Sequence, residues 1–213
     1  NRKVAEFADI LFLAVKPNLF ESVIPQIAEA VTEDMCVVSI AAGQTIAAIE
    51  KLFGKKIHLV RAMPNTPALV GEAMSALSPN DAVTDEELSE VKALFESFGK
   101  AEIVPERLMD AVIGVSGSSP AYVYLFIEAM ADAAVADGMP RAQAYKFAAQ
   151  SVLGAAKMVL ATGQHPGELK DAVCSPGGTT IEGVAALEEA GLRRAVIAGQ
   201  RACVKKSKEM SEQ

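Results

Sequence analysis

The order of strand and helix signals is the feature of this sequence that most constrains its fold. Through the first half, short runs rich in β-branched residues alternate with longer helical runs. The expected strands cover 9–16, 35–43, 56–64 and 101–105, and the expected helices cover 18–31, 45–53 and 84–99, with a weaker apolar stretch at 73–79. Alternation of this kind predicts a parallel sheet covered by helices, with ligands at the carboxyl ends of its strands.

Past about residue 106 the strand signals stop. Helices are expected at Ser119–Ala136, Pro140–Ala161, 166–173, Thr180–Glu189 and Leu192–Met210. Several of these are apolar over most of their circumference, and a half-chain of roughly 100 residues has too little volume to bury them all. We therefore expect an α/β domain at 1–105 and an all-helical domain at 106–213, with a second chain covering the surplus apolar surface.

Local signals mark the ends of several helices. Thr45 is a possible cap, and Thr84 with Glu87 three residues later makes a capping box. Gly99 is expected to stop the helix that Thr84 begins. Pro140 is expected at a first helical position.

Composition excludes several classes of protein. The 213 residues carry a formal net charge of −7 with an isoelectric point near 5.0, which argues against a nucleic-acid surface. The longest apolar run, 120–138, contains Glu128, Asp132 and Asp137, so it predicts a buried helix rather than a membrane span.

The cysteines are three and widely spaced, at positions 36, 174 and 203. They form no CxxC and have no histidine at metal-ligand spacing, so we expect no metal site. This pattern favours a reducing, cytoplasmic setting, and no export signal opens the chain.

Three segments follow expected strands, where an α/β sheet holds its ligand: "AVKP" (14–17), "SIAAGQT" (39–45) and "RAMPNTP" (61–67). Small residues such as Ala41 and Ala42 permit close approach of a flat ring. The competing interpretation is that all three are ordinary turns. In the third, Asn65 and Thr66 between prolines are typical of a turn whose side chains bond its own backbone.

"GVSGSSPAY" (114–122) supplies small residues at a helix start, where the glycines can let two helices cross closely. A nucleophilic serine would need a neighbouring base. His58 falls in an expected strand and His165 precedes a proline, so a Ser–His arrangement is not favoured.

"SPGGTTIEG" (175–183) has the densest signal in the chain. Gly177 and Gly178 are expected to expose consecutive N–H groups before a helix, Ser175 to cap or line the loop, and Thr179 and Thr180 to add hydroxyls. Such a loop suits a small carboxylate with a neighbouring polar atom. The alternative is a glycine-rich helix cap.

The segments "VKP", "VVSIAAG", "RAMPNTPALV", "GVSGSSPAYV" and "HPGELKDAVCSPGGTTIEGVAALE", in this order and spacing, resemble the pyrroline-5-carboxylate reductases, which catalyse the last step of proline biosynthesis. The resemblance covers essentially the whole chain. It implies a Rossmann-type domain followed by an all-helical dimerisation domain, with homodimers that assemble into larger rings.

The resemblance also implies roles for particular residues. The nicotinamide dinucleotide, NADPH or NADH, would lie against Ala14, Val15, Lys16, Pro17, Ala41, Ala42, Asn65 and Thr66. The substrate would lie in the loop formed by Ser175, Gly177, Gly178, Thr179 and Thr180, its carboxylate held by the backbone of Gly178 and Thr179. Thr180 would act as the catalytic residue, placing its hydroxyl beside the ring nitrogen as a hydrogen-bond donor or proton relay.

The chain departs from the family in one respect: it contains no GxGxxG, and the nearest spacing is Gly114 to Gly117. The family places that fingerprint on a first βαβ segment upstream of Asn1, so this segment is expected to be missing here, with cofactor binding weak in its absence.

Two rival functions stay open. Another reductase of Rossmann-plus-helical architecture, a hydroxyacid dehydrogenase or a different imine reductase, would be expected to use a catalytic Lys or Asp, and Lys170 with Asp171 are the candidates. The second rival is a catalytically inactive dimerisation module.

Overall fold

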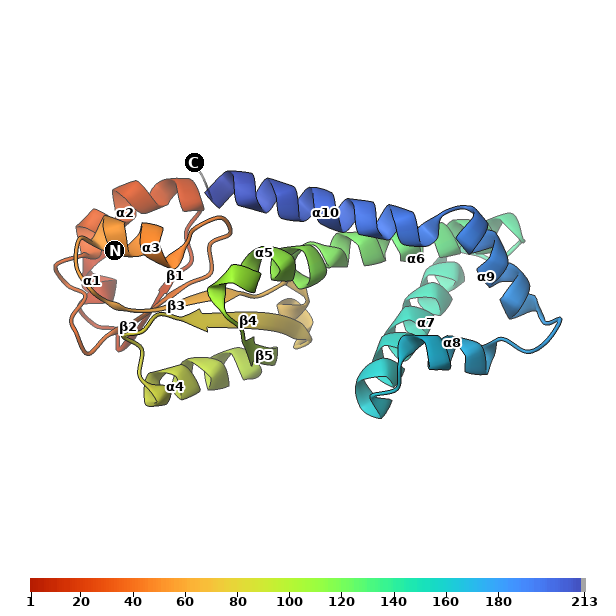
Figure 1. Cartoon of the computed structure of the whole chain (residues 1–213), viewed down its shortest axis with the longest axis horizontal. Helices are drawn as coiled ribbons and strands as arrows, with labels where there is room; N and C mark the ends of the chain where they lie inside the picture. The colour runs from red at the N-terminus through yellow and green to blue at the C-terminus, as the bar shows by residue number, and fades with distance from the viewer. Residues whose placement is uncertain (212–213) are drawn as a thin grey trace. The chain divides into compact units, whose positions relative to one another are not determined.

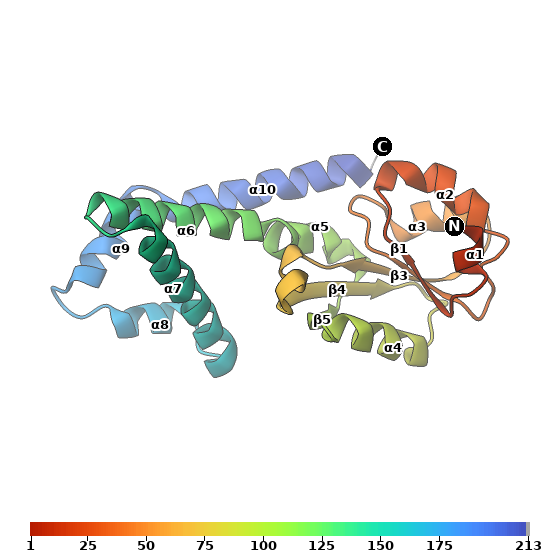
Figure 2. The same ribbon diagram turned by 180° about the vertical axis from the view of Figure 1, so that it is seen from behind.

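The computed structural model describes residues 1–211 of the 213. The chain forms two compact units: the first comprises Asn1–Pro120 with the chain from Gln200 onward, and the second comprises Ala121–Gly199. Figure 1 and Figure 2 show the first unit as a sheet with helices and the second as helices alone. The helical character expected past residue 106 is confirmed, and the domain bounds 1–105 and 106–213 stay a prediction.

The first unit is built on a five-stranded sheet in the order β1-β2-β3-β4-β5. Its strands are β1 (Ile10–Leu13), β2 (Cys36–Ser39), β3 (His58–Met63), β4 (Ala73–Pro79) and β5 (Gly99–Ile103). The first three strands pair in parallel, with Leu13 opposite Ser39 and Ser39 opposite Arg61. Their carboxyl ends therefore meet at one edge, defined by residues 14–17, 41–43 and 65–66, which we call the cofactor edge because the sequence predicts a cofactor there.

The expectation of a fully parallel sheet is wrong at one place, because β4 runs antiparallel to β3. The connection between them is the Pro-rich segment 64–72, which contains the 3-10 helix η2 (Thr66–Val70). A parallel return needs a crossover of about a dozen residues or more, usually helical. Segment 64–72 is too short for one, so the weaker apolar stretch 73–79 turns back as an antiparallel strand.

Helices cover both faces of this sheet. On one face lie α2 (Phe20–Ile27), which the 3-10 helix η1 (Pro17–Leu19) precedes, and α3 (Ile46–Phe53), with the short α1 (Arg2–Ala5) nearby. On the opposite face lies α4 (Asp85–Glu96), as both views show. The two faces have separate cores: Ile24, Ile49 and Leu59 belong to the first, and Val60 and Phe95 to the second.

The helix starts predicted at Thr45 and Thr84 are confirmed. The Thr45 hydroxyl accepts the Ala48 N–H at 3.1 Å, and Thr84 with Glu87 forms a complete capping box. Each of these capping interactions joins residues three positions apart, so the pattern can be recognised in the sequence alone.

The predicted role of Gly99 as a helix stop is wrong. Helix α4 ends at Glu96, and Gly99 is the first residue of β5. A β-carbon on Gly99 would lie 2.3 Å from the Ala73 carbonyl oxygen. Gly99 is therefore required for the close approach of β5 to β4 rather than for a turn.

Residues 106–120 follow the sheet as η3 (Glu106–Leu108), α5 (Met109–Val112) and a π-helical turn, η4 (Ile113–Gly117). The last turns of α10 (Leu192–Ser211) pack on this segment within the first unit. A β-carbon on Gly114 would lie 2.9 Å from side-chain atoms of Gln200 and Val204, which confirms that glycine lets helices approach closely here. The Ser207 hydroxyl donates to Asp110 at 2.6 Å.

The second unit contains most of α6 (Ser119–Ala136), the helices α7 (Arg141–Thr162), α8 (Pro166–Val173) and α9 (Thr179–Glu189), and the start of α10. Pro140 is the residue before α7 rather than its first residue, a one-residue difference from the prediction. Helix α9 begins one residue before the expected Thr180.

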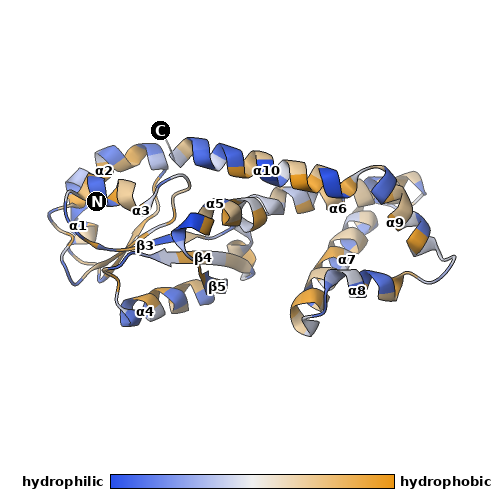
Figure 3. Ribbon diagram, in the orientation of Figure 1, coloured by the Kyte–Doolittle hydropathy of each residue, from blue (hydrophilic) through white to orange (hydrophobic). Residues whose placement is uncertain are grey.

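Large apolar side chains of this unit remain exposed. Figure 3 shows hydrophobic residues spread around α6 and α7. Leu125 is 66% exposed, Phe147 66% and Leu160 86%, as the surplus of apolar helical surface predicts. None of the described helices combines the length and apolar character needed to cross a membrane.

Candidate functional site

The cofactor edge is formed by turns that leave β1 and β2 side by side. The Ile40 N–H donates to the Leu13 carbonyl at 3.5 Å, so the segments that follow these strands start as neighbours. Ala41 is buried and Ala42 half-buried, whereas Ala14 and Lys16 are exposed and Val15 and Pro17 half-buried. Next to them, Gly43 has a φ of +74°, a backbone conformation that favours glycine.

The third segment of the edge follows β3. Asn65 donates from Nδ2 to the Ser116 carbonyl at 3.0 Å and accepts the Met74 N–H on Oδ1 at 3.0 Å. Both ends of its amide are thus used within the protein, but they bond Ser116 and Met74, whereas the turn interpretation expected bonds to the backbone of the turn itself. Thr66 is exposed at the start of η2.

These residues fit one half of a dinucleotide. Small side chains at the carboxyl ends of adjacent parallel strands admit a flat ring, which is the place where open α/β sheets bind such ligands. The glycine-rich loop that cradles a pyrophosphate is absent from the 213-residue sequence. The described residues therefore offer a place for a flat ring, and no residue among them is assigned to the pyrophosphate.

The candidate substrate loop, residues 174–180, joins α8 to α9. Gly177 has a φ of +65°, and Gly178 is the residue that precedes the helix. The Gly178 N–H donates to the Ser175 carbonyl at 3.0 Å. This differs from the expected pair of free N–H groups, because a tight turn takes one of them.

The adjacent pair of free donors is therefore Thr179 and Thr180, rather than Gly177 with Gly178 or the pair Gly178 with Thr179 that the resemblance implies for the carboxylate. The first N–H groups of a helix have no partner inside it, and within residues 1–211 those of Thr179 and Thr180 bond no other group. Thr179 is exposed and Thr180 half-buried. The loop therefore offers two adjacent N–H donors at a helix N-terminus, with the Thr180 hydroxyl beside them, an arrangement that suits a small anion.

Gly178 packs closely against Ser175 in this loop. A β-carbon there would lie 2.4 Å from the Ser175 hydroxyl oxygen and 3.2 Å from the Ser175 carbonyl oxygen. A side chain at this position would therefore require the Ser175 hydroxyl to rotate away and the turn to shift by a few tenths of an ångström.

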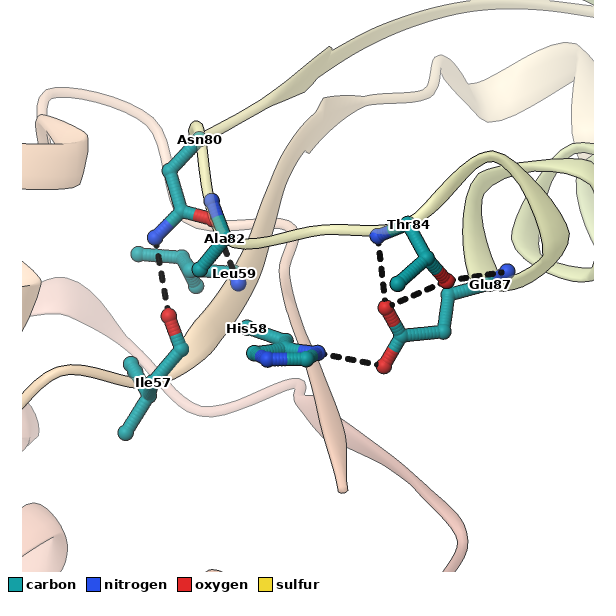
Figure 4. Close-up of polar contacts among 7 residues, drawn as sticks. All are labelled: Ile57, His58, Leu59, Asn80, Ala82, Thr84 and Glu87. Carbon is teal, nitrogen blue, oxygen red and sulfur yellow. Dashed lines mark hydrogen bonds and ion pairs between the residues drawn. The ribbon is translucent and has the colours of Figure 1, made fainter. Parts of the chain in front are cut away.

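Neither histidine hydrogen-bonds a serine within residues 1–211. His58 Nδ1 lies 2.6 Å from Glu87 Oε1 (Figure 4), and His165 Nδ1 accepts the Gly167 N–H at 3.0 Å. Lys170 and Asp171 pair with each other on the surface of α8. The described part of the chain therefore forms no Ser–His pair, and the Lys170–Asp171 pair is the surface ion pair that competes with a direct role in chemistry.

Two charged residues near the cofactor edge were missed by sequence reasoning. Arg61 is 3% exposed on β3 and donates from Nη1 to Glu106 Oε1 at 2.9 Å. The same oxygen accepts the Ile46 N–H at 2.8 Å. An arginine inside the apolar strand 56–64 was the available signal for a buried ion pair, whereas nothing in the sequence marks Glu106 as its partner.

The fold and this edge define a dinucleotide-dependent oxidoreductase of Rossmann type. In agreement, residues 1–43 match the family model described as NADP oxidoreductase, coenzyme F420-dependent, and residues 106–210 match that of the pyrroline-5-carboxylate reductase dimerisation domain. The pyrroline-5-carboxylate reductase of Escherichia coli K12 is 56% identical over 211 residues, which are 99% of this chain and 78% of that protein.

Solved structures agree with this match. The pyrroline-5-carboxylate reductase of Coxiella burnetii superposes with a TM-score of 0.93 at 36% identity, over 100% of this chain and 79% of that one. The enzyme of Plasmodium falciparum with NADP bound superposes with a TM-score of 0.92 at 35% identity, over 99% of this chain and 80% of that one. The chain belongs to the pyrroline-5-carboxylate reductase family, as its sequence motifs predicted.

Proposed function

We propose that this chain reduces 1-pyrroline-5-carboxylate to L-proline with NADPH or NADH, the last step of proline biosynthesis. The observation that carries the proposal is the N-terminus of α9, where the turn at Gly178 leaves two N–H donors beside the Thr180 hydroxyl. A cyclic imino acid presents a carboxylate next to a ring nitrogen. The N–H groups of Thr179 and Thr180 match the first group, and the hydroxyl of Thr180 matches the second.

The reaction asks little acid–base chemistry of the protein. When bound, the reduced nicotinamide would supply a hydride to the carbon of the C=N bond, and the ring nitrogen would take a proton through the Thr180 hydroxyl or from solvent. The protein must hold the nicotinamide ring against the imine ring and provide a hydrogen-bond partner for the imine nitrogen. This fits a site whose two histidines are engaged elsewhere and whose polar groups are backbone N–H and a hydroxyl.

The cofactor half of the proposal rests on the cofactor edge. Ala14, Val15, Lys16 and Pro17 would line one side of the nicotinamide end, and Ala41 and Ala42 the other, with Thr66 close by. Asn65 would hold the turn rather than the ligand, because its amide already bonds Ser116 and Met74.

The exposed apolar helices support self-association. Residues 106–210 match a dimerisation domain, and Leu125, Phe147 and Leu160 leave apolar surface that a second copy would cover. We propose a homodimer that assembles into a larger ring and acts without nucleic acid. The three cysteines are unpaired, which supports a cytoplasmic, reducing location.

The deciding experiment is oxidation of NADPH, and in parallel of NADH, with pyrroline-5-carboxylate as substrate. It is run on the 213-residue chain and on a chimera that carries, ahead of Asn1, whatever sequence of the E. coli relative precedes its match to Asn1. Proline formation by either form supports the proposal. If both forms are folded and dimeric but neither makes proline, the function is wrong and a different imine or a non-catalytic role is favoured.

A further inference from the structure

Glu106 joins three parts of the first unit through one oxygen atom. Its Oε1 accepts the backbone N–H of Ile46, the first residue of α3, at 2.8 Å, and the Nη1–H of Arg61 on β3 at 2.9 Å. Glu106 itself begins η3, directly after the last strand of the sheet. The partners are 60 and 45 residues away along the chain, so the bonds tie elements together rather than stabilise a local turn.

The buried Arg61 side chain fixes the position of the Glu106 carboxylate. That side chain is 4% exposed, whereas the Glu106 side chain is 32% exposed. A buried guanidinium needs a charged partner, and Glu106 is the carboxylate that pairs with it among the described residues. Arg61 Nε and Nη2 are buried without a hydrogen-bond partner in residues 1–211, so no other group replaces the Glu106 contact.

Both hydrogen bonds of Glu106, to Ile46 and to Arg61, connect it with elements that adjoin the cofactor edge. Helix α3 begins just after the segment Ala41–Gly43, so a fixed Ile46 N–H fixes the end of that segment. Arg61 lies on β3, which leads into Asn65. Asn65 in turn donates to Ser116, in the segment that follows Glu106. One carboxylate therefore sets the spacing of two of the three turns that form the edge.

We propose that Glu106 is a positioning residue for the nicotinamide dinucleotide: it holds the Ala41–Gly43 and Asn65–Thr66 turns in the geometry that binds the cofactor. This assignment rests on the proposed function, because it takes that edge as the cofactor site. Glu106 acts through Ile46 and Arg61 and makes no contact with the reacting atoms.

The test compares Glu106→Ala and Glu106→Gln with Asn80→Ala. Asn80 is a matched control because it also joins β4, β3 and α3: its amide donates to the Ile57 carbonyl at 2.8 Å and to Glu50 at 2.7 Å (Figure 4 shows the first of these). Its bonds lie at the amino end of β3, away from the cofactor edge. The dissociation constant of NADPH is measured directly by calorimetry, and steady-state kinetics give KM for NADPH, KM for pyrroline-5-carboxylate and kcat.

We expect all three variants to lower the melting temperature. Glu106→Ala should raise the dissociation constant and KM of NADPH about tenfold, which corresponds to about 1.4 kcal/mol, with kcat at saturating NADPH and KM for the imine unchanged. Glu106→Gln keeps an oxygen acceptor and should show a smaller rise. Asn80→Ala should leave NADPH affinity within about twofold of wild type.

Two results would overturn the assignment, and they differ. If the Glu106 variants bind NADPH as wild type does while losing stability as Asn80→Ala does, the residue is purely structural and the proposed function stands. If the wild-type protein, also in the chimeric form, does not bind NADPH, the proposed function fails first and this role fails with it. Should Glu106→Ala not fold, Glu106→Gln decides, since its side chain is nearly isosteric.

Discussion

Met210, in the last turn of α10, packs directly against Gly43 in the segment between β2 and α3. A β-carbon on Gly43 would lie 3.1 Å from the Met210 β-carbon, and the Gly43 backbone already has a φ of +74°. The C-terminal helix therefore reaches the cofactor edge within the first unit and crowds any side chain at position 43. The contact with Met210 and the positive φ therefore each favour glycine at position 43.

We predict that Gly43→Ala destabilises the protein for both reasons. The left-handed conformation alone costs an alanine about 1–2 kcal/mol, and crowding of Met210 should add about 1 kcal/mol. Gly54→Ala is the control, because Gly54 has a φ of +65° but no atom within 4 Å of its added β-carbon. Urea unfolding gives the unfolding free energy of both variants. Equal losses of that free energy would show that Met210 moves aside without cost.

We predict that Thr180→Ala lowers kcat for pyrroline-5-carboxylate by about tenfold to a hundredfold, because the ring nitrogen loses its hydrogen-bond partner. Thr180→Ser keeps the hydroxyl and should retain most of the turnover. Thr179→Ala removes the neighbouring hydroxyl and serves as the control, with little effect expected. Wild-type turnover and substrate affinity in Thr180→Ala would remove the residue from the mechanism.

Gly178→Ala should weaken substrate binding and leave the cofactor unaffected. The new β-carbon would stand 2.4 Å from the Ser175 hydroxyl oxygen and 3.2 Å from the Ser175 carbonyl oxygen, so the hydroxyl must rotate and the turn that exposes the Thr179 and Thr180 N–H groups must shift by a few tenths of an ångström. We expect KM for the imine to rise, by up to about tenfold, at an unchanged dissociation constant for NADPH.

The control for that variant is Gly183→Ala, further along α9. No atom lies within 4 Å of its added β-carbon. An alanine inside a helix is favoured over glycine by roughly 0.5–1 kcal/mol, so this variant should be slightly more stable and fully active. A similar KM for Gly178→Ala and Gly183→Ala would contradict the steric argument.

Glu87 should make stability depend on pH in the acid range. Burial alone would raise the pKa of its carboxyl, but hydrogen bonds from Thr84 and His58 outweigh it and hold the pKa below the ordinary value of 4.5. The lowered pKa contributes stability at every pH above that ordinary value. The contribution is lost as the pH falls through the lower folded-state value.

The measurement is denaturant unfolding of wild type and Glu87→Gln at neutral and acid pH. The difference in unfolding free energy between wild type and Glu87→Gln should be present at neutral pH and should disappear in acid. Glu86→Gln removes the same charge from an exposed position in the same helical turn, and should show a smaller gap at neutral pH. A gap for Glu87→Gln that persists unchanged into acid would contradict the assignment.

Leu125→Glu should reduce self-association. Leu125 is 66% exposed on α6, and burying a glutamate against apolar surface of a second copy is unfavourable. Light scattering after gel filtration should show a larger monomer fraction for this variant. Gln143→Glu adds a charge at an exposed polar position of α7 and should leave the mass distribution unchanged.

The sequence by itself determined the helix starts at Thr45 and Thr84, the order of elements and the position of the candidate loop. The capping hydrogen bonds join residues within one helical turn, Thr45 with Ala48 and Thr84 with Glu87. Their pattern can therefore be recognised in the sequence. The loop at 175–180 was identified by composition and by its resemblance to a known family. Its donors could be assigned only to within a residue, because the turn that occupies the Gly178 N–H depends on backbone geometry.

Only the tertiary structure decided which distant residues meet. The antiparallel pairing of β4, the role of Gly99 beside Ala73 and the packing of Met210 on Gly43 involve no local pattern. The same holds for Glu106, whose carboxylate is placed by a buried arginine 45 residues earlier. Periodicity and capping report on neighbours along the chain, whereas these contacts arise when separate elements pack into one core and must satisfy each other's charge and volume.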